Sequence, residues 1–450
     1  MIVERLLGRI VPLLLCTGLV VLLRFGDVTA PVSGAQGAPM AIGYLLLAAY
    51  LGGKSAKALG LPRITGYLIV GVLVGPYASG LLQRDVLAAA RVVEGIAVAL
   101  IALAAGGELR IAWVRQHARR VAVLVALALA TVWIGVVALL LLGRSWFPFL
   151  DGASAVEAVA IAVVFGAIAV SCSPMVTLAV LNENRADGPL SRTTLGVVIL
   201  MDIAVIVLFA ASLAAARSIL GGEQGGASLA TVLARELGGS IVAGFVVGVG
   251  VILFLRTIGR DVAVFVLGLC YGISQVSDAL HLEPLLVALA AGFVVENFSG
   301  GLGHRLIEGV ERMALPIFAL FFAVAGAKVD LGALATVGPL AVMVAVVRAV
   351  LMRAGTRLGA RLSGADPVVA RDLWLGLISQ AGVSLALAAT VARAFPEWGG
   401  SLQAMVLAMI AVHELVGPVV FQRALARSGE IGRASHGSAA PPAPRATHAA

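Results

Sequence analysis

The sequence predicts an all-α polytopic membrane protein with about thirteen transmembrane helices. Of its 450 residues, 60% are hydrophobic and 12% are charged, whereas a soluble domain has roughly 45–50% apolar and 25% charged residues. Apolar runs long enough to cross a hydrocarbon core of about 30 Å recur from end to end. Strand-type alternation is absent from the sequence, and helices satisfy their own backbone hydrogen bonds in lipid. The apolar surface is therefore expected to face the membrane.

The apolar runs predict thirteen crossings in chain order. They lie near residues 41–60, 64–82, 92–109, 119–143, 154–181, 193–216, 228–255, 261–276, 280–298, 309–328, 333–356, 369–392 and 399–422. If the first crossing starts outside, the inside loops hold about three times as many Lys and Arg residues as the outside loops, as the positive-inside rule requires. We therefore expect a multi-pass protein of the cell inner (plasma) membrane with a cytoplasmic C-terminus. This bias also accounts for the net charge of +8, so the charge does not indicate a nucleic-acid partner.

The two ends of the chain differ from the middle. Residues 1–40 contain an apolar run, Ile10 to Leu23, after Arg5 and Arg9. This run is either an extra helix or a cleaved signal. Residues 41–427 form the transmembrane domain. Residues 428–450, rich in Ala and Pro, are expected to be a disordered cytoplasmic tail.

Four strings of the sequence resemble one transporter family. They are LGLPRITGYLIVGVLVGP at 59–76, LPIFALFFAVAGAKVDL at 315–331, ISQAGVSLALA at 378–388 and HELVGPVVFQRALARSGE at 413–430. Their order and spacing resemble the monovalent cation:proton antiporter-2 family, the bacterial sodium/proton exchanger-like transporters. The resemblance covers about residues 41–430.

The resemblance implies an inverted-repeat fold in which two broken helices cross in the membrane. A core domain would move against a dimerisation domain, and members are usually homodimers. The implied function is exchange of Na+ or K+ for H+, with no cofactor besides the transported ions. No catalytic triad, phosphate loop or zinc spacing appears in the sequence, so we do not expect an enzyme. Two alternatives remain open: the membrane subunit of a glutathione-gated K+ efflux-type system, whose regulatory subunit would be a separate chain, and a non-transporting sensor with the same fold.

Asp202 is the strongest candidate for the ion site. It stands nine residues beyond the helix start expected near Thr193, which puts it about 13 Å deep in the bilayer. A charge at that depth costs roughly 2.5–3.5 kcal/mol, so the carboxylate needs a partner, a proton or a cation. The alternative is an Asp that is hydrogen-bonded inside the bundle. In the resembling family this position binds the cation and the proton, which makes Asp202 the expected Na+ or K+ ligand.

The residue before Asp202 is Met201, where the electrogenic branch of the family has a second carboxylate. One titrating carboxylate exchanges one proton for one cation. The sequence therefore predicts electroneutral exchange.

Two segments are expected to break their helices. Pro174 opposes helix at Ser173, and the freed carbonyls with the hydroxyls of Ser171 and Ser173 could bind a monovalent cation. A kinked packing helix is the alternative. In the second segment Gln380, Gly382 and Ser384 could line the crossing, or serve only as polar packing.

One arginine is expected to be the charge partner of Asp202. Relatives often have a base near the middle of the helix that covers residues 333–356, and the candidates here are Arg348 and Arg353. Arg348 is favoured by its depth, because a mid-membrane Arg needs a carboxylate or carbonyl partner. Arg353 is expected at the cytoplasmic edge. Four carboxylates are expected near crossing ends: Glu108, Glu296, Asp330 and Glu414. His413 is expected to be a packing residue.

Overall fold

The computed structural model describes residues 38–83, 87, 88, 90–109, 111–220, 238–280, 282–329 and 331–433. Within these ranges the chain forms α-helices and two short 3-10 helices, with no strand. Most of the N-terminal segment 1–40, Asp330 and tail residues 434–450 lie outside the described residues. The all-helical fold class predicted from the sequence is confirmed.

Every predicted crossing contains a helix or a pair of helices. The helices are α2 (Ala38–Ala58), α3 (Arg63–Val74), α5 (Arg91–Glu108), α6 (Ile111–Leu142), α7 (Ala155–Val170), α8 (Pro174–Asn184), α9 (Pro189–Leu220), α11 (Gly239–Thr257), α12 (Val262–Leu280), α13 (Pro284–Phe298), α14 (Gly303–Ala327), α15 (Leu331–Ser363), α16 (Pro367–Gly376), α17 (Gly382–Ala394) and α18 (Gly399–Ser428). Among the described residues, six spans are long and apolar enough to cross a membrane, one of them being the α7–α8 pair taken together, or seven if the bent α14 counts as one span. Several other apolar helices are shorter, so the count of thirteen spans stays a prediction.

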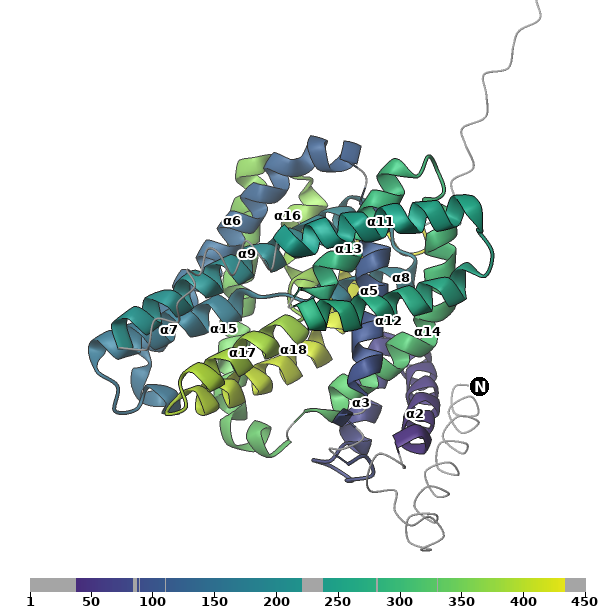
Figure 1. Ribbon diagram of the computed structural model, residues 1–450. Coiled ribbons are helices and arrows are strands. Elements are labelled where there is room, and N and C mark those ends of the chain that lie inside the picture. The colour runs from purple at the N-terminus through teal and green to yellow at the C-terminus, as the bar shows by residue number, and fades with distance from the viewer. Residues whose placement is uncertain are drawn as a thin grey trace, which may run out of the picture.

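The helices pack as two groups, which Figure 1 shows side by side. The broken-helix group contains α6, α7, α8, α9, α15, α16, α17 and α18, and its most extensive helix contact is between α6 and α15. The scaffold group contains α2, α3, α5, α11, α12, α13 and α14, and its most extensive helix contact is between α5 and α13. Contacts between the groups are sparser and involve mainly α3 and α5 on one side and α8 and α18 on the other.

Glycines let the scaffold helices approach closely. A Cβ atom on Gly106 of α5 would overlap the carbonyl oxygen of Leu289 in α13, and one on Gly292 of α13 would overlap that of Leu103 in α5. Small residues of this kind are the usual means of packing helices in lipid, where apolar surface alone gives no preference for a protein neighbour. The α5–α13 contact is therefore fixed by backbone-to-backbone packing.

The broken-helix group repeats one pattern twice. A long helix (α6 or α15) precedes a broken pair (α7 with α8, or α16 with α17), which precedes a second long helix (α9 or α18). The two first helices pack on each other, and the two broken pairs cross at their breaks. This arrangement matches the two crossed broken helices expected from the sequence.

Large apolar side chains are exposed on the outer faces of several helices. They include Ile134 on α6, Val246 and Leu253 on α11, and Val350 on α15, each more than half exposed. Such faces are stable only against lipid or another apolar partner. The protein is therefore a multi-pass membrane protein.

Candidate functional site: two crossed helix breaks

The first break separates α7 from α8. α7 ends at Val170, and α8 starts at Pro174, whose ring fits the first helical position and whose missing N–H rules out continuation from α7. Ser173 caps α8, with its hydroxyl accepting from the Val176 amide at 3.3 Å. Residues 171–173 are thus buried, non-helical backbone between the two halves of the span, as the sequence predicted.

The second break separates α16 from α17 and contacts the first directly. Ser173 N donates to the Ser379 carbonyl at 2.8 Å, and the hydroxyls of Ser171 and Ser384 form a hydrogen bond. Thr177 Oγ1 donates to the carbonyl of Gly376, the last residue of α16, at 3.1 Å. The structure therefore brings together the serines of both predicted segments.

Arg348 of α15 lies at the junction of the two breaks and is 0% exposed. Its guanidinium donates to four backbone carbonyls, two from each broken pair: Ala169 at 2.6 Å, Ser171 at 2.6 Å, Leu377 at 3.1 Å and Ile378 at 2.9 Å. These carbonyls belong to the C-terminal ends of α7 and α16, where the helix dipoles are negative. The Arg348 guanidinium thus stabilises both helix ends. Of the two kinds of partner expected for this arginine, a carboxylate or a carbonyl, the structure shows carbonyls.

Arg353 has a different setting. Its side chain is exposed on α15, and its guanidinium carbon lies 5.6 Å from the ring centroid of Trp374. Only Arg348 of the two candidates lies at the crossing. Its hydrogen bonds go to carbonyls, and within the described residues no ion pair joins it to Asp202.

Gln380 links the breaks to α18. Its side-chain NH2 donates to the Ile168 and Ala169 carbonyls and to Ser171 Oγ, each at 3.3 Å. The amide oxygen therefore faces His413 Nδ1, 2.8 Å away. Because an amide oxygen only accepts, His413 carries its proton on Nδ1. The packing histidine expected from the sequence thus holds the side chain that ties the two breaks together.

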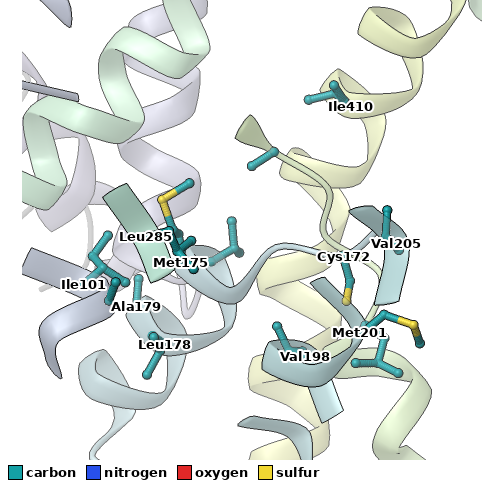
Figure 2. Close-up of a cluster of buried hydrophobic side chains, with 14 of the residues drawn as sticks. Ile101, Cys172, Met175, Leu178, Ala179, Val198, Met201, Val205, Leu285 and Ile410 are labelled. Carbon is teal, nitrogen blue, oxygen red and sulfur yellow. The ribbon is translucent and has the colours of Figure 1, made fainter. Parts of the chain in front are cut away.

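Asp202 lies midway along α9 and is 3% exposed. Its Oδ1 is buried and has no hydrogen-bond partner among the described residues. The break residue Cys172 lies within electrostatic reach of both Asp202 and Arg348, and Figure 2 shows its thiol beside Met201. A buried acceptor without a partner is costly, so this carboxyl group needs a proton or a cation.

Glu414 is not near a helix end, so that prediction is wrong. α18 runs from Gly399 to Ser428, which puts Glu414 midway along it, and the residue is 5% exposed. Glu296 is in the last turn of α13, as expected. Glu108 ends α5, also as expected.

Two further carboxylates that sequence reasoning did not single out make well-defined contacts. Glu430, 1% exposed, accepts from the amides of Leu190 and Ser191 at 2.8 Å each and from the Ser191 hydroxyl at 2.6 Å. It thereby caps α9, the helix of Asp202. Glu183 of α8 accepts from the Arg63 amide of α3. For both Glu430 and Glu183, the only feature of the sequence that pointed to these contacts was a charged residue beside a helix end.

The crossed breaks, with a buried carboxyl group and a buried guanidinium beside them in a multi-pass protein, define an ion-coupled membrane transporter. Irregular backbone is tolerated at this depth where it builds an ion site. The chain belongs to the sodium/hydrogen exchanger family: the family model described as "Sodium/hydrogen exchanger, transmembrane" matches residues 43–427. The membership confirms the monovalent cation:proton antiporter resemblance, and the family is one of transporters rather than of enzymes.

Relatives agree with this membership, and a solved structure shares the fold. The chain is 24% identical over 349 residues to the "Na(+)/H(+) antiporter" of Enterococcus hirae, covering 76% of this chain and 86% of that protein. It is 24% identical over 353 residues to the "Na(+)/H(+)-K(+) antiporter GerN" of Bacillus cereus, covering 78% and 86%. The structure of the sodium proton antiporter MjNhaP1 from Methanocaldococcus jannaschii superposes with a TM-score of 0.64 at 18% identity, covering 86% of this chain and 98% of that chain.

Proposed function

We propose that the protein exchanges a monovalent cation, Na+ or K+, for H+ across the bacterial inner membrane, with Asp202 as the group that binds either ion. The observation that carries the proposal is the buried carboxyl of Asp202, whose Oδ1 has no hydrogen-bond partner among the described residues. A proton or a dehydrated cation satisfies that oxygen, and the two compete for it. The relatives named as Na+/H+ and Na+/H+-K+ antiporters support this substrate class.

Ser173 and Ser171 would supply further oxygen ligands beside Asp202, and the breaks would supply carbonyls. The Ser171 hydroxyl already donates to the Ile168 carbonyl at 2.9 Å and contacts Ser384, so it would have to exchange a partner to reach the ion. Gln380 and Ser384 would hold the crossing. Arg348 would balance the charge of the site by occupying the two negative helix ends.

The same proposal includes a cytoplasmic C-terminus and a homodimer in the membrane. The excess of Lys and Arg on the side of the C-terminus supports the orientation. The exposed apolar faces support lipid contact throughout, and the family resemblance supports the dimer.

The test is exchange by the purified protein in proteoliposomes, with internal pH followed after addition of NaCl, KCl or choline chloride. We expect Na+ or K+, but not choline, to drive proton movement, and Asp202→Asn to abolish it while the protein still inserts. Asp187→Asn is the matched control, because Asp187 is partly exposed and pairs with Arg192 outside the crossing. Exchange near the wild-type rate in Asp202→Asn would refute the proposed site.

A further inference from the structure

One carboxylate bridges the two helix groups at the end of the protein where α18 finishes. Glu183 belongs to α8 of the broken-helix group, and Arg63 begins α3 of the scaffold group. Both carboxylate oxygens accept from the Arg63 backbone N–H, Oε1 at 2.8 Å and Oε2 at 2.9 Å. Arg63 Nε adds an ion-pair contact at 3.9 Å. The Glu183 side chain is only 12% exposed, so this contact is largely shielded from water.

The position of Glu183 is explained by α3 and not by its own helix. Pro62 is the N-cap of α3 and makes no side-chain cap, whereas helix N-termini are normally capped by an acceptor side chain. Glu183 supplies that acceptor from the other helix group. Within α8 it sits in the last turn, where the helix dipole disfavours a carboxylate. The favourable interaction of Glu183 is therefore the one across the group boundary.

Apolar side chains also meet across that boundary. Figure 2 shows Met175, Leu178 and Ala179 of α8 beside Ile101 of α5 and Leu285 of α13. Apolar side chains in contact are non-directional and allow one surface to slide on another. A charge-assisted hydrogen bond is directional and has one geometry. Glu183 thus gives this sliding surface a defined position.

α8 connects this contact to the ion site. The helix begins at Pro174, directly after the first break, and Glu183 follows nine residues later, so about 14 Å of rigid helix separates the break from Glu183. Alternating access moves one helix bundle against the other around the site. Any such movement that carries α8 along α3 must break the bond between Glu183 and the Arg63 amide.

We propose that Glu183 is a positioning residue that locks the broken-helix group to the scaffold group at this end of the protein, and that the lock releases in each transport cycle. This proposal rests on the proposed function, because it requires the two helix groups to move relative to each other. Loss of the lock shifts the equilibrium toward the released arrangement, in which the α8 face leaves α5.

The test uses cysteine reporters in full-length protein in nanodiscs. Cys16, Cys172 and Cys270 are replaced by Ala, and Ala179→Cys is placed on the α8 face that meets the scaffold group. Ala128→Cys is the control, because Ala128 of α6 is buried against α15, a helix of the same group. The rate of labelling by N-ethylmaleimide is then compared with and without Glu183→Ala. We expect labelling at 179 to become about tenfold faster, the effect of one charge-assisted hydrogen bond on an opening equilibrium, with no change at 128.

A second variant separates the lock from simple helix capping. Pro62→Ser gives α3 its own cap, so Glu183→Ala/Pro62→Ser should recover thermal stability while labelling at 179 stays fast. Unchanged labelling at 179 in Glu183→Ala, equal acceleration at 128, or slow labelling restored by Pro62→Ser would each overturn the proposal. Because labelling requires no ion exchange, these outcomes are independent of whether Asp202→Asn abolishes transport.

Discussion

The guanidinium of Arg348 donates to the backbone carbonyl of Ser171 at 2.6 Å, and the Ser171 side chain in turn contacts Ser384 of the opposite break. A charge on α15 is thus linked through one residue to both broken helices. Since four carbonyls share this guanidinium, its removal leaves several buried acceptors unpaired.

Replacing Arg348 by Ala is expected to damage the protein far more than replacing Arg353 by Ala. Each buried carbonyl left without a donor costs about 1–3 kcal/mol, while the exposed Arg353 loses a cation–π contact worth about 0.5–1 kcal/mol. Thermal unfolding in detergent, followed by tryptophan fluorescence, measures the difference. Equal or reversed shifts in the melting temperature would show that Arg348 is not the arginine that holds the crossing.

Replacing His413 by Ala is expected to weaken the crossing without removing Asp202. Gln380 Oε1 loses its donor, at a cost of about 1–3 kcal/mol for a buried group. We expect a lower melting temperature and a raised apparent KM for the cation. His413→Asn should change both less than His413→Ala does, because the Asn amide can still donate to Gln380. His304→Ala is the control, because His304 is exposed in the first turn of α14, a helix of the scaffold group. A melting temperature as little changed as in the control would contradict this role.

Glu430→Ala is expected to destabilise the start of α9. Loss of a capping acceptor costs about 0.5–2 kcal/mol, and Glu430 serves two amides and one hydroxyl. Faster hydrogen exchange at Leu190 and Ser191 is the direct readout, with the exposed Glu397→Ala as the control. Unaltered exchange at these two amides would mean that other groups cap the helix.

Local rules predicted the parts of the site that local chemistry determines. Pro174 fixes the first break because its ring excludes the preceding helical turn, and the position of Asp202 midway along its helix follows from the apolar run around it. The partners of Arg348 could not be predicted in the same way, since Ala169 and Ile378 come near it only through the crossing of two distant segments. Glu414 was misplaced for a related reason: α18 continues to Ser428, past the apolar run that was used to judge its end. Contacts that cap one helix from another, such as those of Glu183 and Glu430, leave no periodic signal in the sequence.

The exchange is expected to be electroneutral. Met201 cannot titrate, so each half-cycle carries either one cation or one proton on Asp202. Arg348 keeps its charge, because a guanidinium does not deprotonate in proteins, and its four carbonyl partners hold it in place. A one-for-one exchange moves no net charge, whereas two protons per cation would be driven by about 2.3 kcal/mol per 100 mV.

The measurement imposes a potassium–valinomycin potential on proteoliposomes, with Na+ as the transported ion, and follows internal pH. We expect the Na+-driven proton flux to be the same at positive, zero and negative potential. A flux that changes with the sign of the potential would contradict electroneutrality and require a second titrating group. Glu414 would then be the first residue to replace by Gln, because it is a carboxylate that, like Asp202, is buried midway along a long helix. Loss of the potential dependence in Glu414→Gln, with exchange retained, would identify it as the second proton carrier.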